Sequence, residues 1–276
     1  MDLDFYVDSV AVDVVTAELE KLSCPLFFRP HLEIKESDFF INVRNVASYR
    51  VQNGDRVHVH PHENADIESI KLFLNGSVLG AVLHQKGILP FHGCSFEYNG
   101  LGIIISGLSG SGKSSVTTAF CQNGGRFIND DITPVQIGES VTTILPIKTK
   151  IKLWDDSLRS LNIKNDNLQR IRPSMDKFYI SLPEKMLTEQ PLNHIFILAK
   201  HNEDIFKVNE LSGMAKYNVL RNQIYRKSYL KGMPETSKAY FKQLCKLAQQ
   251  IRITQVIRPQ ICSIYDTMNF IKQQIV

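Results

Sequence analysis

Residues 107–114 have the residue types and the spacing that bind a phosphate chain. They read Gly-Leu-Ser-Gly-Ser-Gly-Lys-Ser and match the pattern GxxxxGK[ST] at every fixed position. Glycines let backbone N–H groups turn inward around an anion, and a following helix presents its positive N-terminus to it. We predict that Lys113 reaches the β and γ phosphates of a nucleotide and that the Ser114 hydroxyl ligates Mg²⁺. The predicted nucleotide-binding residues are Gly107, Ser109, Gly110, Ser111, Gly112, Lys113, Ser114 and Ser115.

Two adjacent carboxylates, Asp130 and Asp131, follow the loop. We expect them at the end of a strand, where α/β sheets place ligand-binding residues. Neighbouring carboxylates repel, so we expect a cation beside them or a proton on one of them; the alternative is a loop-capping role. A phosphate loop specifies no reaction, and transfer to a hydroxyl also requires a metal ligand and a base. A second pair, Asp155 and Asp156, is instead predicted to supply the N-cap and first-turn charge of a helix.

The elements that must position the loop alternate between strand and helix. Residues 101–106 are an apolar run without polar alternation, as in a strand covered on both faces. Residues 115–123 are predicted to form a helix that Gly124 and Gly125 stop. Further predicted strands are 126–128 and 195–198, together with a hairpin of 135–137 and 141–145.

The flanking regions differ in their periodicity. The first 60 residues read mainly as strands (38–43, 46–51 and 57–60, with a turn at Asn53-Gly54), followed by a helix from the N-cap Asp66 to Gly87. The last third reads as helices at 211–230, 236–250 and 264–275, the second with Phe241, Leu244, Cys245 and Ala248 on one face. We predict one α/β unit over 1–276, with a β-rich N-terminal layer (1–63), a phosphate-loop core (64–207) and a helical C-terminal part (208–276).

Composition and charge exclude several function classes. The chain has 276 residues, of which 43% are hydrophobic, so it can bury a core. The net charge of +4 is spread along the chain and forms no basic stripe for nucleic acid. No apolar run is long enough to cross a membrane, and the start lacks the order of a signal peptide, which predicts a cytoplasmic protein. The five cysteines form no CxxC pair, so we expect them to be reduced and mostly buried, with no zinc site.

With a preceding histidine, the loop and the carboxylate pair resemble the catalytic half of the HPr kinase/phosphorylase family. The segment 89–135 contains Pro90-Phe91-His92-Gly93, then the loop, then the pair. The resemblance implies an α/β P-loop core like that of phosphoenolpyruvate carboxykinase. It also implies that Asp130 is the base for a serine hydroxyl, that Asp131 assists or holds the metal with Ser114, and that His92 lies beside the transferred phosphoryl group.

The remainder of the chain departs from the HPr kinases, since it has no recognisable N-terminal regulatory domain and no counterpart of their later Arg- and Gly-containing loop. It is more similar to shorter HPr-kinase-like proteins, some of which phosphorylate the C-terminal serine of a lasso-peptide precursor. Two segments carry this likeness, His84-Gln85-Lys86-Gly87 and Lys152-Leu153-Trp154. The resemblance implies an ATP- and Mg²⁺-dependent kinase. Its expected partners are a peptide or small protein with an acceptor serine and, in a homo-oligomer, further copies of the chain.

Two alternatives stay open, a kinase for a small metabolite on the same scaffold and a nucleotide-binding regulator. A regulator needs a metal ligand but no base, so the Asp pair discriminates it from both kinases.

Several basic residues are candidates for binding the acceptor. Lys148, Lys150 and Lys152 alternate as on one strand face, and the resemblance at Lys152-Leu153-Trp154 implies that Lys152 is the first candidate; a solvated strand edge is the alternative. Arg172 and Lys177 are further candidates, because phosphoryl transfer needs cations beyond the loop lysine. Arg221 and Arg226 are expected on a solvated or salt-bridged helix face. The alternating His58, His60 and His62 are expected at an exposed strand end rather than on a metal.

Overall fold

The computed structural model describes residues 5, 12–147, 150–172, 175–182 and 184–275. Its backbone divides into two compact units, the first made of residues 1–90 and 224–243 and the second of residues 91–223 and 244–276. These limits differ from the predicted boundaries after residues 63 and 207. That the whole chain acts as one catalytic unit stays a prediction.

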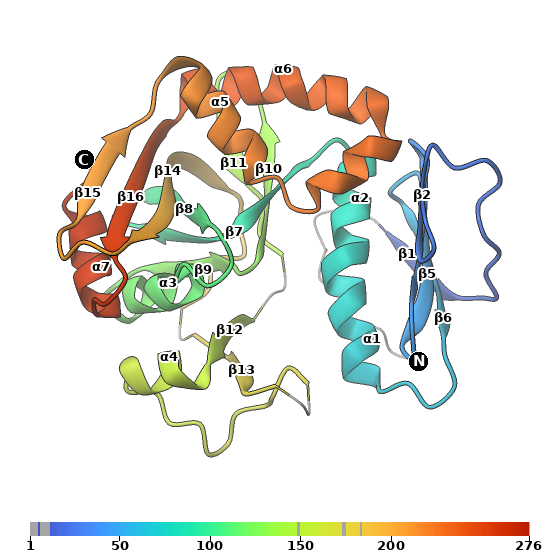
Figure 1. Cartoon of the computed structure of the whole chain (residues 1–276), viewed down its shortest axis with the longest axis horizontal. Helices are drawn as coiled ribbons and strands as arrows, with labels where there is room; N and C mark the ends of the chain where they lie inside the picture. Colours follow the sequence, from blue (N-terminus) through green and yellow to red (C-terminus); the bar gives the residue numbers. More distant parts are fainter. Residues whose placement is uncertain (1–4, 6–11, 148–149, 173–174, 183, 276) are drawn as a thin grey trace. The chain divides into compact units, whose positions relative to one another are not determined.

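The first unit is a sheet with helices on one face (Figure 1). Its described strands have the order β1-β6-β5-β4-β3-β2, parallel between β1 and β6 and otherwise antiparallel. The strands are β1 (Asp13–Thr16), β2 (Phe27–Arg29), β3 (Leu32–Ile34), β4 (Asp38–Val43), β5 (Ala47–Gln52) and β6 (Arg56–Pro61). The helices are α1 (Ile67–Phe73), the π turn η1 (Leu74–Val78), α2 (Leu79–Gln85) and the 3₁₀ turn η2 (Lys227–Gly232). The predicted strands, the hairpin turn and the helix are confirmed.

Sequence periodicity explains this unit. Alternate residues of β4 and β5, such as Phe39 and Tyr49, are fully buried and pack with helix residues that include Leu74. The Asp66 carboxylate caps α1 by accepting from the Ser69 N–H at 2.8 Å. Gly87, with φ +68°, takes the left-handed conformation that ends α2.

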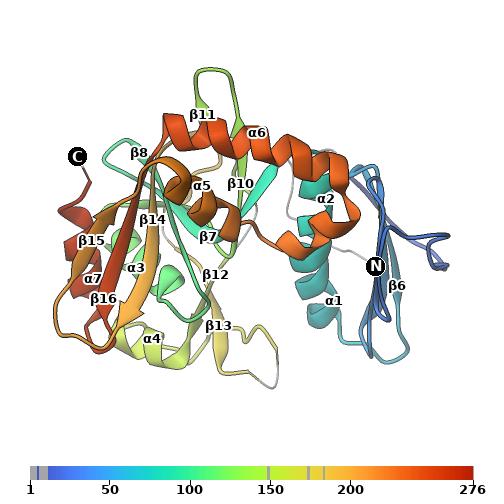
Figure 2. The same cartoon turned by 45° about the horizontal axis from the view of Figure 1, so that its top comes forward.

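The second unit is a mixed sheet whose centre is parallel. Its described strands have the order β11-β10-β7-β8-β14-β16-β15, with β9 beside β7, and β8, β14 and β16 run parallel. Figures 1 and 2 show α3 and α7 on one side of this sheet and α5 on the other. The strands are β7 (Leu89–Tyr98), β8 (Leu101–Gly107), β9 (Arg126–Asn129), β10 (Ile132–Ile137), β11 (Thr142–Ile144), β14 (Gln190–His201), β15 (Lys207–Glu210) and β16 (Arg252–Pro259). The helices are α3 (Lys113–Gln122), α5 (Gly213–Asn222), α7 (Ile264–Lys272) and the end of α6 (Pro234–Gln250).

A small two-stranded element completes this unit. Strands β12 (Ile151–Trp154) and β13 (Lys177–Ile180) pair antiparallel, and α4 (Asp155–Ser160) follows β12 directly. Ile151 and Leu153 of β12 belong to the same buried cluster as Phe120 of α3. The element is thereby fixed against the helix that follows the phosphate loop.

The predicted strands and hairpin around the loop are confirmed, but the last third is not wholly helical. β15 and β16 lie within it, and the predicted helix 211–230 ends at Asn222. Arg226 has φ 51°, a left-handed conformation that interrupts a helix. In α6 the buried positions are Tyr240, Leu244 and Leu247, whereas Phe241 is 54% exposed.

Two further findings concern the cysteines and the membrane. All five cysteines are free, but only Cys94 and Cys121 are buried, so the prediction that most are buried is wrong. Among the described residues, no helix has both the length and the hydropathy to span a membrane.

Candidate functional site

The phosphate loop lies between β8 and α3, as predicted. All residues of β8 after Leu101 are buried, and the loop connects Gly107 to Lys113. Gly107 has φ +140°, and a Cβ there would lie 2.4 Å from the Leu198 carbonyl oxygen of β14. Gly112, just before the helix, has φ +104°. Side chains are strained at both positions, so glycine gives the loop its conformation.

Lys113 lies across the loop with its ammonium group bound to backbone carbonyls. Its Nζ donates to the oxygens of Gly107 at 3.0 Å and Leu108 at 3.2 Å, and lies 3.4 Å from His92 Nε2. The residue is 8% exposed, and burial lowers its pKa below the ordinary value. A phosphate group at the loop would offer this cation stronger acceptors than the neutral carbonyls.

The first carboxylate, Asp130, is buried and its oxygens are hydrogen-bonded. Its Oδ1 accepts from Ser114 Oγ at 2.8 Å and from Cys94 Sγ at 3.0 Å, and its Oδ2 accepts from the Lys152 N–H at 3.0 Å. Burial, together with the Asp130 charge, raises the pKa of the Cys94 thiol well above its ordinary value, so the thiol stays protonated. Asp130 is therefore joined to the loop serine and not directed into open space.

The second carboxylate, Asp131, lines the cleft. Its backbone is left-handed, with φ 70°, and its side chain is 41% exposed. His92 Nδ1 lies 3.3 Å from Asp131 Oδ1, and Lys152 Nζ lies 3.9 Å from Oδ2. Burial opposes ionisation, but the hydrogen bond from His92 and the charges of Lys152 and Lys177 outweigh it and hold the pKa of Asp131 well below its usual range. The two adjacent carboxylates thus face different surroundings.

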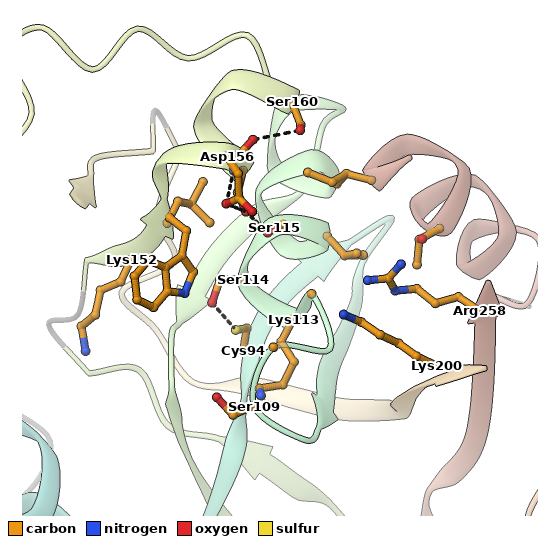
Figure 3. Close-up of a pocket in the computed structure, with 18 of the residues that line it drawn as sticks. Cys94, Ser109, Lys113, Ser114, Ser115, Lys152, Asp156, Ser160, Lys200 and Arg258 are labelled. Carbon is orange, nitrogen blue, oxygen red and sulfur yellow. Dashed lines mark hydrogen bonds between the residues drawn. The ribbon is translucent and has the colours of Figure 1, made fainter. Parts of the chain in front are cut away.

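A cleft of about 360 Å³ opens over the loop. Its lining includes the predicted residues His92, Ser109, Gly110, Gly112, Lys113, Ser114, Ser115, Asp131, Lys152 and Lys177. Lys177 Nζ lies 5.6 Å from the ring centre of Trp154, which is also in the lining. Figure 3 shows Lys152 on one side of Lys113 and two further cations, Lys200 and Arg258, on the other.

Other predicted residues lie elsewhere. Arg172, in the connection to β13, is not among the described residues that line the cleft, and neither is Lys150. Lys148 falls outside the described residues. His58 and His60 lie on β6 of the first unit, and the described residues contain no group of three His, Cys, Asp or Glu side chains that could hold a metal ion.

The predictions for the second Asp pair and for the two helix arginines are confirmed only in part. Asp155 and Asp156 supply first-turn charge to α4, as predicted, but the N-cap position is Trp154. Arg221 lies on α5, whereas Arg226 lies in the left-handed break and donates to Ser77 Oγ at 2.8 Å. Arg226 is therefore exposed, as predicted, but it does not lie on the predicted helix.

Sequence reasoning did not select Cys94, Lys200 or Arg258. Lys200 and Arg258 are distant in sequence, and only the pairing of β14 with β16 brings them together. The signal that was present is a basic residue shortly after each of two runs rich in strand-forming side chains, Ile195–Leu198 and Ile253–Ile257. Cys94 carried no signal beyond its position two residues after His92.

Comparisons with known proteins show structural similarity but no sequence match. No family model matches the chain, and no curated protein matches it. Among solved structures, the chain is similar to the HPr(Ser) kinase/phosphatase from Coxiella burnetii, with 8% sequence identity and a TM-score of 0.33. The match covers 67% of this chain and 89% of that chain.

Proposed function

We propose that this chain is an ATP- and Mg²⁺-dependent kinase that transfers a phosphoryl group to a serine hydroxyl of a peptide or small protein. The observation that carries the proposal is the position of Asp131 in the cleft, beside Lys113, His92 and Lys152. A site that only binds nucleotide needs a metal ligand, which Asp130 can supply. A second carboxylate facing the phosphates would weaken binding by repulsion, so its presence favours a role in chemistry.

The donor half of the site consists of the loop, Lys113, Ser114 and Asp130. Ser114 Oγ and the Asp130 carboxylate are 2.8 Å apart, and both are oxygen ligands of the kind Mg²⁺ prefers. Mg²⁺ is usually held by one or two protein groups with phosphates and waters, so this small donor set fits it. When bound, Mg²⁺ neutralises charge on the β and γ phosphates.

The geometry favours roles for the two carboxylates that differ from the sequence-based assignment. Asp130, bonded to Ser114, Cys94 and the Lys152 N–H, suits the metal side. Asp131 faces the cleft and suits the base. The serine proton passes to an Asp131 oxygen while the bond from serine Oγ to the γ phosphorus forms and the bond from that phosphorus to the bridging oxygen breaks, releasing ADP.

The low pKa of Asp131 keeps it ionised and able to accept a proton, but it also makes the carboxylate a weak base. A bound triphosphate brings negative charge close to Asp131 and competes for the hydrogen bond from His92. Both effects raise the pKa of Asp131, toward the range in which a carboxylate is an effective base. Donor binding would in this way activate the base.

Lys152 and Lys177 make the acceptor side of the cleft cationic. They suit a serine near a carboxylate, because such an acceptor brings a second anion to the γ phosphate. We therefore take the C-terminal serine of a peptide, as in a lasso-peptide precursor, as the acceptor to test first. Arg172, which does not line the cleft, is not included.

The test is phosphoryl transfer from ATP to short peptides that end in serine, followed by mass spectrometry. A matched peptide with alanine in place of the serine is the control. The proposal predicts a phosphate on the terminal serine and none on the alanine peptide. ATP binding without transfer to any peptide would favour a nucleotide-binding regulator instead.

A further inference from the structure

Two cations lie side by side at the carboxyl end of the central parallel strands. Lys200 of β14 and Arg258 of β16 are directly paired in the strand register, and the phosphate loop begins where β8 ends beside them, with Gly107 paired to Leu198. Figure 2 shows β14 and β16 as neighbours in this sheet. Both residues line the cleft. Parallel α/β sheets bind ligands at this edge.

Neither cation is neutralised within the part of the chain that the structure describes. The Arg258 guanidinium donates only to uncharged acceptors, the Ser111 carbonyl at 3.2 Å, the Pro259 carbonyl at 3.2 Å and Cys262 Sγ at 3.2 Å. Lys200 makes no described ion pair or hydrogen bond. Like charges directly opposite on neighbouring strands repel. An anion between them would remove this cost.

We propose that Lys200 and Arg258 form a second anion subsite that binds the α phosphate of a nucleoside triphosphate, beyond the two phosphates that the loop and Lys113 hold. The inference rests on the proposed function only for the direction in which the triphosphate extends along the cleft. If the γ phosphate lies toward Asp131 and Lys152, the triphosphate extends across Lys113 to the opposite side of the cleft, where Figure 3 shows Lys200 and Arg258. Beyond them, the first turn of α7 lines the cleft with Ile264 and Thr267 and can adjoin the nucleoside.

The contacts of Arg258 explain how the subsite would be fixed. Its Nε and one terminal nitrogen are held by the loop and by the segment before α7, while its other terminal nitrogen lies 3.6 Å from where a Gly112 Cβ would be. The guanidinium is thus held at the loop before a ligand arrives, which lowers the ordering cost of binding. Lys200 adds a second charge beside it.

Calorimetric titration of the purified full chain with inorganic pyrophosphate, inorganic tripolyphosphate and ATP, at fixed Mg²⁺, tests the subsite. The wild-type chain should bind tripolyphosphate about tenfold or more tighter than pyrophosphate. Lys200→Gln and Arg258→Gln should each weaken tripolyphosphate and ATP by about tenfold or more and change pyrophosphate by less than about threefold. Arg252→Gln, at the other end of β16 and paired with Glu210, is the matched control and should change none of them.

Arg258 also contacts the loop, so Lys200→Gln is the decisive variant. If Lys200→Gln leaves tripolyphosphate and ATP affinity unchanged, or lowers pyrophosphate affinity equally, the subsite is overturned. The assay contains no peptide and measures no turnover. A chain that binds as predicted but transfers nothing to serine refutes the proposed kinase and keeps the subsite. Transfer to serine by a chain whose tripolyphosphate affinity Lys200→Gln does not change keeps the kinase and refutes the subsite.

Discussion

The two units use their central histidines differently. His84 of the first unit is fully buried, its Nε2–H donates to the Tyr225 carbonyl at 2.9 Å, and its Nδ1 lies 3.2 Å from the Tyr240 hydroxyl. Burial lowers its pKa to about 4. His92 of the second unit is 32% exposed and lies between Asp131 and Lys113 at the cleft.

The difference shows which polar groups serve the fold and which are available to a ligand. Both ring nitrogens of His84 have partners inside the first unit, so removing the imidazole removes two polar contacts from its interior. His92, Asp131 and Lys113 instead line the cleft, where a ligand can contact them. Asp130 and Asp131 repeat the contrast between neighbouring residues, the first hydrogen-bonded in the interior and the second facing the cleft.

The largest expected effect comes from removing the cleft cation nearest the loop. Lys113→Ala should lower phosphoryl transfer by about 10³-fold or more, because it removes the charge directed at the β and γ phosphates. Its thermal unfolding should change little, since its ammonium group bonds to two carbonyls of its own loop and otherwise lies near the partly exposed His92. Lys207→Ala, on the surface of the same unit, is the control. Wild-type turnover in Lys113→Ala would refute the kinase.

The buried carboxylate of Asp130 should contribute to Mg²⁺ binding. Asp130→Asn should weaken Mg²⁺-dependent ATP binding by about tenfold or more, because a charged ligand beside Ser114 is lost. Titration of ATP with and without Mg²⁺ measures this, and affinity without Mg²⁺ should not fall. An equal loss in both conditions would show that Asp130 supports the loop and not the metal.

The two histidines should separate stability from activity. His84→Leu should lower the free energy of unfolding by about 1–3 kcal/mol, because the Tyr225 carbonyl loses its buried donor. Turnover per folded molecule should stay near wild type. His92→Gln should instead lower turnover and leave the denaturant midpoint of unfolding nearly unchanged. If both variants change the same property, the distinction between the two regions is wrong.

The low pKa of His84 predicts a pH dependence of stability. Its folded pKa, about 4, is below the ordinary value of 6.5, so the unfolded chain binds more protons between these values. His194 of the second unit, buried at 2.8 Å from Thr254 Oγ1, behaves likewise because burial lowers its pKa to about 4. Stability should fall as pH falls from 6.5 toward 4, by up to about 1.4 kcal/mol per pH unit for each histidine. Denaturant melts at several pH values give the free energy of unfolding, and this free energy should depend less steeply on pH in His84→Leu than in the wild type.

The smallest expected effect concerns the acceptor cations. Lys152→Gln and Lys177→Gln should raise the KM for a peptide with a free C-terminal carboxylate by roughly threefold to tenfold and leave the KM for ATP nearly unchanged. Amidating the peptide should remove most of the difference between variants and wild type, because the recognised charge is absent. An equal rise in the KM for the amidated peptide would show that the lysines do not bind that carboxylate.

Local patterns were sufficient to predict the strand, loop and helix around Lys113. An apolar run, glycines with required backbone freedom and a helix stopped by Gly124 all act within about 20 residues of one another. The same holds for Asp66 as an N-cap and for the hairpin at Asn53-Gly54. These features depend on short-range geometry, which sequence carries directly.

Other features depend on long-range pairing and could not be predicted locally. Lys200 meets Arg258 only because β14 and β16 are parallel neighbours. The residues 252–259 contain the β-branched side chains of a strand, but the helical segments on both sides of them favour a helical prediction for the whole region. The different surroundings of Asp130 and Asp131 follow from the positive φ of Asp131, for which the pair Asp-Asp gives no local signal.

Single-turnover transfer by Asp131→Asn, with ATP affinity measured in parallel, tests the central claim most directly. Asparagine keeps the size of the side chain but cannot accept the serine proton. The account predicts ATP affinity unchanged or higher, since a negative charge near the phosphates is lost, and transfer to peptide serine slower by about 10²-fold or more. Transfer at the wild-type rate in Asp131→Asn would contradict the account and return the role of base to another group.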